Sequence, residues 1–197
     1  MRHPAALLLM LASTLAFARQ RSLLPQLAKP AEGNGVCKLE SLPQEIRNRL
    51  TMEFASWKVQ VPETLSPHAH ERWESEKPQQ CPGIAIGQFE KDKTISYGVL
   101  LTHQGRADAN YKFLVFSPKG VTPSFEMRVL DQSDDGGGSN LFIRGVGIGK
   151  FFSESLKKKF QVQAREGILL VDSGENEYEA DIYFWVSDAY QRQPVDY

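Results

Sequence analysis

The chain has 197 residues, of which 41% are hydrophobic and 24% charged, and it contains 15 Gly, 11 Pro and 2 Cys. This length fits one domain, or one domain with an appended segment, and the ordinary composition excludes a disordered chain, a collagen-like chain and a coiled-coil rod. The formal charge of −1, from 23 Lys and Arg against 24 Asp and Glu, provides no basic field for phosphates, so no nucleic-acid partner is expected.

The first residues, 1–18, have the pattern of a signal peptide. Arg2 precedes an apolar run, and Ala16-Phe17-Ala18 places small residues where a signal peptidase reads. The run is shorter than the ~20 residues that span a bilayer, although an N-terminal membrane anchor is the alternative. We therefore expect an exported protein, in the periplasm or outside the cell, with no membrane insertion after cleavage of the signal.

The two cysteines follow the predicted cleavage site. Residues 19–36 contain Pro and Gly with scattered charge and are expected to be a flexible leader, so the folded part is predicted as one α+β domain over 37–197. An oxidising compartment favours a disulfide between Cys37 and Cys81 over the alternative of two buried thiols. In the chain-entropy model, closing this loop is worth roughly 4 kcal/mol.

A first helix is predicted where apolar residues recur every four positions. The series runs from Leu42 to Phe54, with Trp57 three positions further on, and it places these side chains on one helix face. Ser41 and Gln44 have the spacing of a capping box at the helix start. This face is expected to pack on the core.

A second, shorter helix is predicted to begin at Ser66-Pro67, with Ser as N-cap and Pro at the first helical position. His68 and His70 lie two positions apart on it. Residues with this spacing point to nearly opposite sides of a helix, so this pair is not expected to hold one metal ion. On a strand the two would share a face and could do so.

From Cys81 onward the period changes from about four to two, which predicts short antiparallel strands separated by turns. Residues 131–140 form a longer polar loop. No window has the length of a crossover helix, so the predicted fold class is α+β, with the N-terminal helices packed on a mainly antiparallel β-sheet (a meander) of about six to eight strands. The predicted strands cover residues 84–86, 97–102, 111–116, 125–129, 141–146, 159–163, 167–171 and 178–187.

Two catalytic motifs are absent from the sequence. The run Gly145-Val146-Gly147-Ile148-Gly149-Lys150 lacks the spacing of a phosphate-binding loop, and Phe151 stands where that loop needs a hydroxyl. Glycines in a β-rich region more often mark a bulge or a close approach of backbones. No Gly-x-Ser-x-Gly turn of a serine hydrolase occurs either.

Residues 87–101, a charged segment that leads into an apolar strand, resemble an FG-GAP segment. In that family an acidic loop binds calcium between the strands of a propeller blade. The resemblance makes Glu90 and Asp92 weak candidates for calcium ligands, while Gln88 and Ser96 stand where the family has acids. The alternative is a β-hairpin with a charged turn over 90–94.

Aromatic residues in the last strand suggest a ligand surface. Tyr183 and Trp185 lie on one face of this strand, and with Tyr97 nearby they would form a recognition surface for carbohydrate or protein. The alternative is that the helix over 42–57 covers this face. More broadly, Trp57, Trp73, Cys81-Pro82-Gly83 and Tyr183-Phe184-Trp185 make the chain similar to small exported bacterial proteins of unknown function, a resemblance that implies no activity.

Few histidines, no nucleophile motif and no cofactor fingerprint favour an exported non-catalytic binding or protein-interaction module with an unknown ligand and no cofactor. Catalytic residues are not identified. The alternatives are an exported hydrolase with paired carboxylates drawn from 131–135, Glu154 or 175–179, and a β module stabilised by calcium at Glu90 and Asp92.

Overall fold

The computed structural model describes residues 37–76, 80–90, 94–103, 110–120, 124–153, 155, 158, 164–174 and 178–196. The predicted signal peptide and leader over 1–36 lie outside the described residues, as do Asp92, Glu154, the strand expected over 159–163 and residues 175–177. Those expectations remain predictions.

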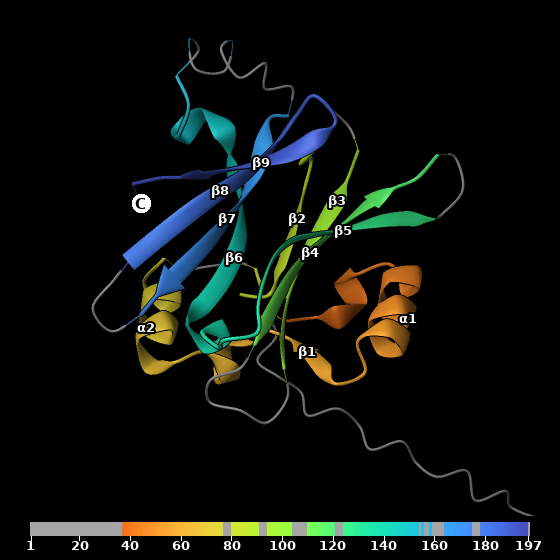
Figure 1. Cartoon of the computed structure of the whole chain (residues 1–197), viewed down its shortest axis with the longest axis vertical. Coiled ribbons are helices and arrows are strands. Elements are labelled where there is room, and N and C mark those ends of the chain that lie inside the picture. Colours follow the sequence, from red (N-terminus) through yellow and green to blue (C-terminus); the bar gives the residue numbers. More distant parts are fainter. Residues whose placement is uncertain are drawn as a thin grey trace, which may run out of the picture. The chain divides into compact units, whose positions relative to one another are not determined.

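Antiparallel β-sheet makes up most of the described chain and is accompanied by two α-helices (Figure 1). The described residues form two sheets, whereas the sequence predicted a single meander. Sheet A contains β1 (Trp57–Val59), β2 (Ile84–Gly87), β3 (Ser96–His103), β4 (Tyr111–Pro118) and β5 (Phe125–Ser133). Sheet B contains β6 (Leu141–Gly147), β7 (Glu166–Ser173), β8 (Tyr178–Val186) and β9 (Ala189–Pro194). The helices are η1 (Leu39–Ser41), α1 (Gln44–Glu53), η2 (Pro62–Thr64), α2 (Pro67–Ser75), η3 (Gly138–Asn140) and η4 (Ile148–Lys150).

The strand orders of the two sheets differ. Sheet B is a meander in the order β6-β7-β8-β9, and sheet A has the order β1-β3-β4-β5. In sheet A, β2 pairs with the same edge of β3 as β1, because Val59 lies opposite Leu101 and Ile84 lies opposite Val99. β5 and β9 are therefore the outermost strands on the other side of each sheet.

The sheets pack face to face because their central strands are apolar on both faces. In β3, Leu100 packs with Phe113 against residues of sheet B, whereas its neighbours Val99 and Leu101 pack against Ile46 of α1. Sheet B repeats this pattern, and its outer face packs against Trp73 of α2. The layers thus follow the order α1, sheet A, sheet B, α2, with the helices on opposite sides of the sheet pair (Figure 1).

The second helix begins as predicted, since the Ser66 hydroxyl accepts a hydrogen bond from the Ala69 amide at 3.4 Å. The capping box predicted for the first helix is wrong, because Pro43 is the N-cap of α1. The first helix is also shorter than expected. Trp57 instead begins β1, where pairing with His103 and an edge-to-face contact between their rings at 5.4 Å hold it in a strand.

The disulfide between Cys37 and Cys81 is present and spans a sequence separation of 44, which confirms the predicted pairing. It joins Cys37, two positions before η1, to the chain entering β2 and is consistent with an oxidising, exported location. In the part of the chain that the structure describes, no helix has both the length and the apolar character needed to cross a membrane.

The two sheets are joined directly where β2 meets β6. The Ile143 amide donates a hydrogen bond to the Pro82 carbonyl at 2.7 Å. Beside it, the fully buried Gln60 side chain donates to the carbonyls of Gly138 and Leu141 at 3.1 and 3.2 Å. Gly83 allows this close approach, since a Cβ there would lie 2.4 Å from the Gln60 carbonyl oxygen. We call this junction the β2–β6 seam.

Candidate functional site

On the opposite side, the sheets separate and leave a pocket of about 320 Å³ between β5 and β9. We call it the β5–β9 cleft. It lies between the outermost strands of the two sheets and beside the turn between β8 and β9, and no residue of α1 or α2 lines it. Its lining residues are Arg128, Val129, Leu130, Tyr183, Asp188, Ala189, Tyr190 and Arg192.

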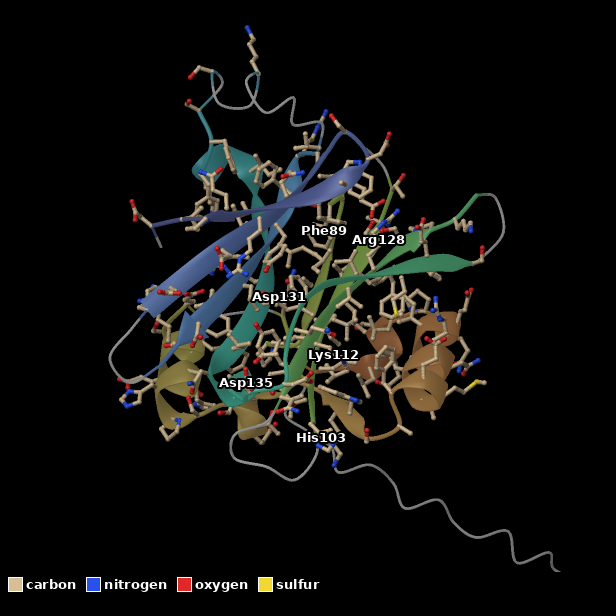
Figure 2. The ribbon with its side chains drawn as sticks, viewed as in Figure 1. Phe89, His103, Lys112, Arg128, Asp131 and Asp135 are labelled. Carbon is tan, nitrogen blue, oxygen red and sulfur yellow. A yellow bond between two sulfur atoms is a disulfide. The ribbon has the colours of Figure 1, made fainter. Side chains whose placement is uncertain are left out.

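A β-bulge in β5 turns Asp131 toward this cleft. Leu114 lies opposite Val129, but the next residue of β4, Phe113, lies opposite Asp131, so Leu130 is an extra residue in β5. Strict alternation would place Asp131 on the same face as Val129, away from sheet B. The extra residue shifts the alternation by one position, so the Asp131 side chain lies on the same face as Phe113, toward sheet B. Figure 2 labels Arg128 and Asp131 along β5.

Asp131 is the centre of one polar network. The Tyr183 hydroxyl donates to Asp131 Oδ2 at 2.8 Å, and Arg192 Nη1 lies 3.3 Å from the same oxygen. Arg192 Nη2 donates to Asp181 Oδ2 at 2.7 Å, and this hydrogen bond raises the pKa of Arg192. One guanidinium, whose side chain is 55% exposed, therefore neutralises two largely buried carboxylates at the mouth of the cleft.

The tyrosines near Asp131 stay protonated. Burial, followed by the hydrogen bond to Asp131, raises the pKa of Tyr183. Burial and the charge of Asp131 raise the pKa of Tyr111 to about 12. Both phenols are therefore hydrogen-bond donors at neutral pH rather than bases or nucleophiles.

A second polar network lies around the buried carboxylate of Glu90. The Ser117 hydroxyl and Arg128 Nη1 both donate to Glu90 Oε1, the latter at 2.9 Å. The Arg128 guanidinium also stacks over the ring of Trp185 at 4.9 Å. This contact joins β5 of sheet A to β8 of sheet B.

Two buried donors next to Arg128 have no hydrogen-bond partner among the described residues. They are Trp185 Nε1 and the Tyr190 hydroxyl, whose rings meet edge to face at 5.0 Å. Burial and the nearby charge of Glu90 raise the pKa of Tyr190, but its hydroxyl makes no hydrogen bond of acceptable geometry to that carboxylate. Unpaired buried donors are costly, so their position beside a cleft is notable.

The aromatic residues predicted as a ligand surface do not share one open face. Tyr183 and Trp185 are 2% and 3% exposed. Tyr183 packs against Phe113 of sheet A, and the Arg128 guanidinium of β5 lies over Trp185, so these contacts come from sheet A rather than from the helix over 42–57. Tyr97 packs on the other face of sheet A, with its ring 5.8 Å from that of Phe125. The structure therefore places Tyr183 in the lining of the cleft and Trp185 under the cleft residue Arg128, and it leaves Tyr97 elsewhere.

Among the carboxylates predicted for a hydrolase, Asp131 contacts the cleft residues Tyr183 and Arg192, whereas Asp134, Asp135 and Glu179 are exposed and do not line the cleft. Asp181, which shares Arg192 with Asp131, was not predicted as an acid of the site. Asp181 and Tyr183 are two positions apart in one strand and so lie on the same face, and this spacing is the signal that could have identified Asp181. Tyr190 and Arg192 were missed because β9 is polar and lacks the apolar alternation of a strand.

The described residues do not fit a calcium site at Glu90. The Arg128 guanidinium, 2.9 Å from its carboxylate oxygen, opposes a divalent cation. Within the described ranges, no three His, Cys, Asp or Glu side chains gather as a metal site requires. β2 and β3 pair with Gly87 opposite Ser96, which is the strand arrangement of the hairpin alternative.

Comparison of the chain with protein-family models, curated proteins and solved structures finds no match. The functional argument therefore rests on the geometry of the cleft. The cleft combines cationic donors, carboxylate acceptors held by those donors, and tyrosine rings within a small enclosed volume.

Proposed function

We propose that the protein is an exported, non-catalytic binding module and that its ligand occupies the β5–β9 cleft. The observation that carries this proposal is the Asp131–Arg192–Asp181 arrangement at the mouth of a pocket of about 320 Å³, next to unpaired buried donors. This volume is at the lower end of the ~300–1,000 Å³ typical of small-molecule sites. The disulfide supports export, since it is suited to an oxidising compartment.

Binding is favoured over catalysis because the largely buried carboxylates around the cleft are paired, whereas Asp188 in its lining is exposed to solvent. The carboxylates of Glu90, Asp131 and Asp181 are all held by arginine. The raised pKa of Tyr183 also removes it as a base near neutral pH. Such a site provides fixed donors and acceptors rather than an activated group.

The ligand that best fits these groups is a small neutral carbohydrate. Its hydroxyls can donate to carboxylates and accept from guanidinium groups, while an apolar ring face lies against tyrosine. The described carboxylates around the cleft outnumber Arg128 and Arg192, which disfavours an anionic ligand. A protein loop carrying hydroxyl side chains is the other partner class with this chemistry.

Isothermal titration with a panel of neutral mono- and disaccharides tests the proposal. We expect Arg192→Ala to weaken binding at least about tenfold, because it removes a charged hydrogen-bond donor and releases two carboxylates. Arg47→Ala is the matched control, since the Arg47 side chain donates a hydrogen bond to Gln44 within α1, away from the cleft. Equal affinities of the two variants would refute the cleft as the binding site.

The hydrolase remains a second candidate because Asp131 and Asp181 both pair with Arg192, which lines the cleft. Paired carboxylates are the groups that cleave glycosidic bonds. The same saccharides, followed for product release, distinguish the two functions. Turnover that disappears in Asp131→Asn would establish the hydrolase, and binding without turnover would establish the binding module.

A further inference from the structure

A second pocket, of about 270 Å³, lies beside the outer face of sheet B, between the end of α2 and β6. We call it the α2–β6 groove. We propose that an extended peptide binds in this groove as an additional strand along β6 and presents a carboxylate to Lys150. The lining residues are Trp73, Glu76, Gln80, Phe142, Ile143, Arg144, Gly145, Val146, Gly147 and Lys150.

The edge of β6 offers free backbone groups in this groove. The Ile143 amide donates to Pro82, so it points away from β7. Backbone direction alternates along a strand, so the amides and carbonyls of Gly145 and Gly147 point the same way. The Ile148 amide, which donates to the Arg165 carbonyl at 3.0 Å, has the opposite direction that this alternation requires.

No described residue supplies a backbone partner for Gly145 or Gly147 on this side. Gly147 is exposed and both glycines line the groove, so another chain can reach their backbone groups. Strand edges are usually blocked by proline, charge or a bulge. This stretch of β6 has no proline and no bulge, and its one charged residue, Arg144, is paired with Glu76.

The side chains around the edge define the chemistry of the peptide. Trp73, Phe142 and Val146 provide an apolar wall for alternate side chains of an added strand. Glu76 is held by Arg144 and lies 3.4 Å from Arg72. Lys150 is exposed and forms no ion pair with any described residue. A carboxylate, from a chain terminus or from an Asp or Glu side chain, complements it.

Two substitutions at Gly147 separate the backbone contact from the fold. Its φ of −68° and ψ of 124° suit proline, and its amide points away from β7. Gly147→Pro therefore removes the free donor and keeps the pairing within sheet B, while Gly147→Ala adds a similar bulk and keeps the donor. The two variants form a matched pair.

The probes are fluorescein-labelled peptides of alternating Val and Thr: one with a free C-terminal carboxylate, its C-terminal amide, and an amide with an internal Asp. Fluorescence anisotropy measures their affinity for the disulfide-bonded protein. We expect the wild type and Gly147→Ala to bind alike and Gly147→Pro to bind at least about tenfold more weakly. The comparison of free acid, amide and internal Asp identifies the source of the carboxylate.

Amide NMR provides a direct structural readout, since the Gly145 and Gly147 signals should shift and gain exchange protection on peptide binding. Lys150→Gln should weaken binding several-fold and reduce its salt dependence. Arg192→Ala, in the other cleft, should leave peptide binding unchanged. Absence of binding by all three peptides, or equal binding by the two Gly147 variants, overturns the proposal.

Discussion

The β2–β6 seam and the β5–β9 cleft join the same two sheets by different means. At the seam, a backbone hydrogen bond of 2.7 Å and the fully buried Gln60 side chain hold the sheets together. At the cleft, charged side chains connect them, and the connecting arginine, Arg192, is 55% exposed. One side of the sheet pair is thus fixed by backbone and packing, and the other by contacts that water and a ligand can reach.

This difference indicates where stability and where binding should reside. Exposed ion pairs contribute little to stability, typically ~0–1 kcal/mol, so the cleft can exchange its contacts for a ligand at small cost. The disulfide and Gly83 lie beside the seam, where they hold the scaffold that positions the cleft. Substitutions on the two sides should therefore affect different measurements.

The largest effect on stability is expected from loss of the disulfide. The double variant Cys37→Ala with Cys81→Ala should lose roughly 4 kcal/mol of unfolding free energy, because the unfolded chain regains the entropy of a loop with a sequence separation of 44. Urea unfolding, followed by tryptophan fluorescence, measures this loss. A variant as stable as the wild type would show that the bond does not secure the seam.

A smaller loss of unfolding free energy is expected from a substitution at the seam itself. Gly83→Ala places a Cβ 2.4 Å from the Gln60 carbonyl oxygen, so backbone must move, at a cost of about 1–3 kcal/mol. Gly147→Ala is the matched control, because a Cβ there meets nothing within 4 Å. The difference between the two melting temperatures measures the effect, and equal values would contradict the tight seam.

Alkaline pH should weaken the cleft side progressively. The folded state keeps the proton of Tyr111, whose pKa is raised to about 12, while the unfolded chain loses it near the ordinary value of 10. The free energy of unfolding is therefore unaffected by this group below pH ~10 and falls as the pH rises toward ~12. Tyr111→Phe should reduce the fall. Tyrosinate absorbance of the native protein checks the shift, and titration of Tyr111 at the ordinary value would contradict it.

The smallest effect on stability is expected at the mouth of the cleft. Arg192→Ala should change the free energy of unfolding by less than about 1 kcal/mol, because its side chain is 55% exposed, so water can take its place beside the two carboxylates, and Tyr183 still donates to Asp131. Its effect on saccharide affinity should be much larger. A stability loss as large as that of Gly83→Ala would mean that the cleft is part of the scaffold rather than an adaptable site.

The disulfide, the start of α2 and several strands could be predicted from the sequence. The pairing of Cys37 with Cys81 followed from the export signal, and Ser66-Pro67 correctly marked the start of α2. The alternating runs identified antiparallel strands such as β4 and β8. These features depend on local chemistry, which the sequence carries directly.

The rest depends on contacts between distant residues. β1 is too short to show alternation, and Trp57 joins it through pairing with His103. The bulge at Leu130 changes the face of Asp131 without any local signal, so the loop predicted from residue 131 begins as part of β5. Two sheets arise because runs such as Ile168 to Val171 are buried on both faces, and a single sheet with helices would leave one face uncovered.

Backbone amide NMR during a saccharide titration tests the central claim most directly. The account predicts that the shifted signals come from residues 128–131 and 188–192, around the β5–β9 cleft, and that the signals of Gly83 and Ile143 at the seam stay in place. Saturable shifts confined to the seam, or no shift with any neutral saccharide of the panel, would contradict it.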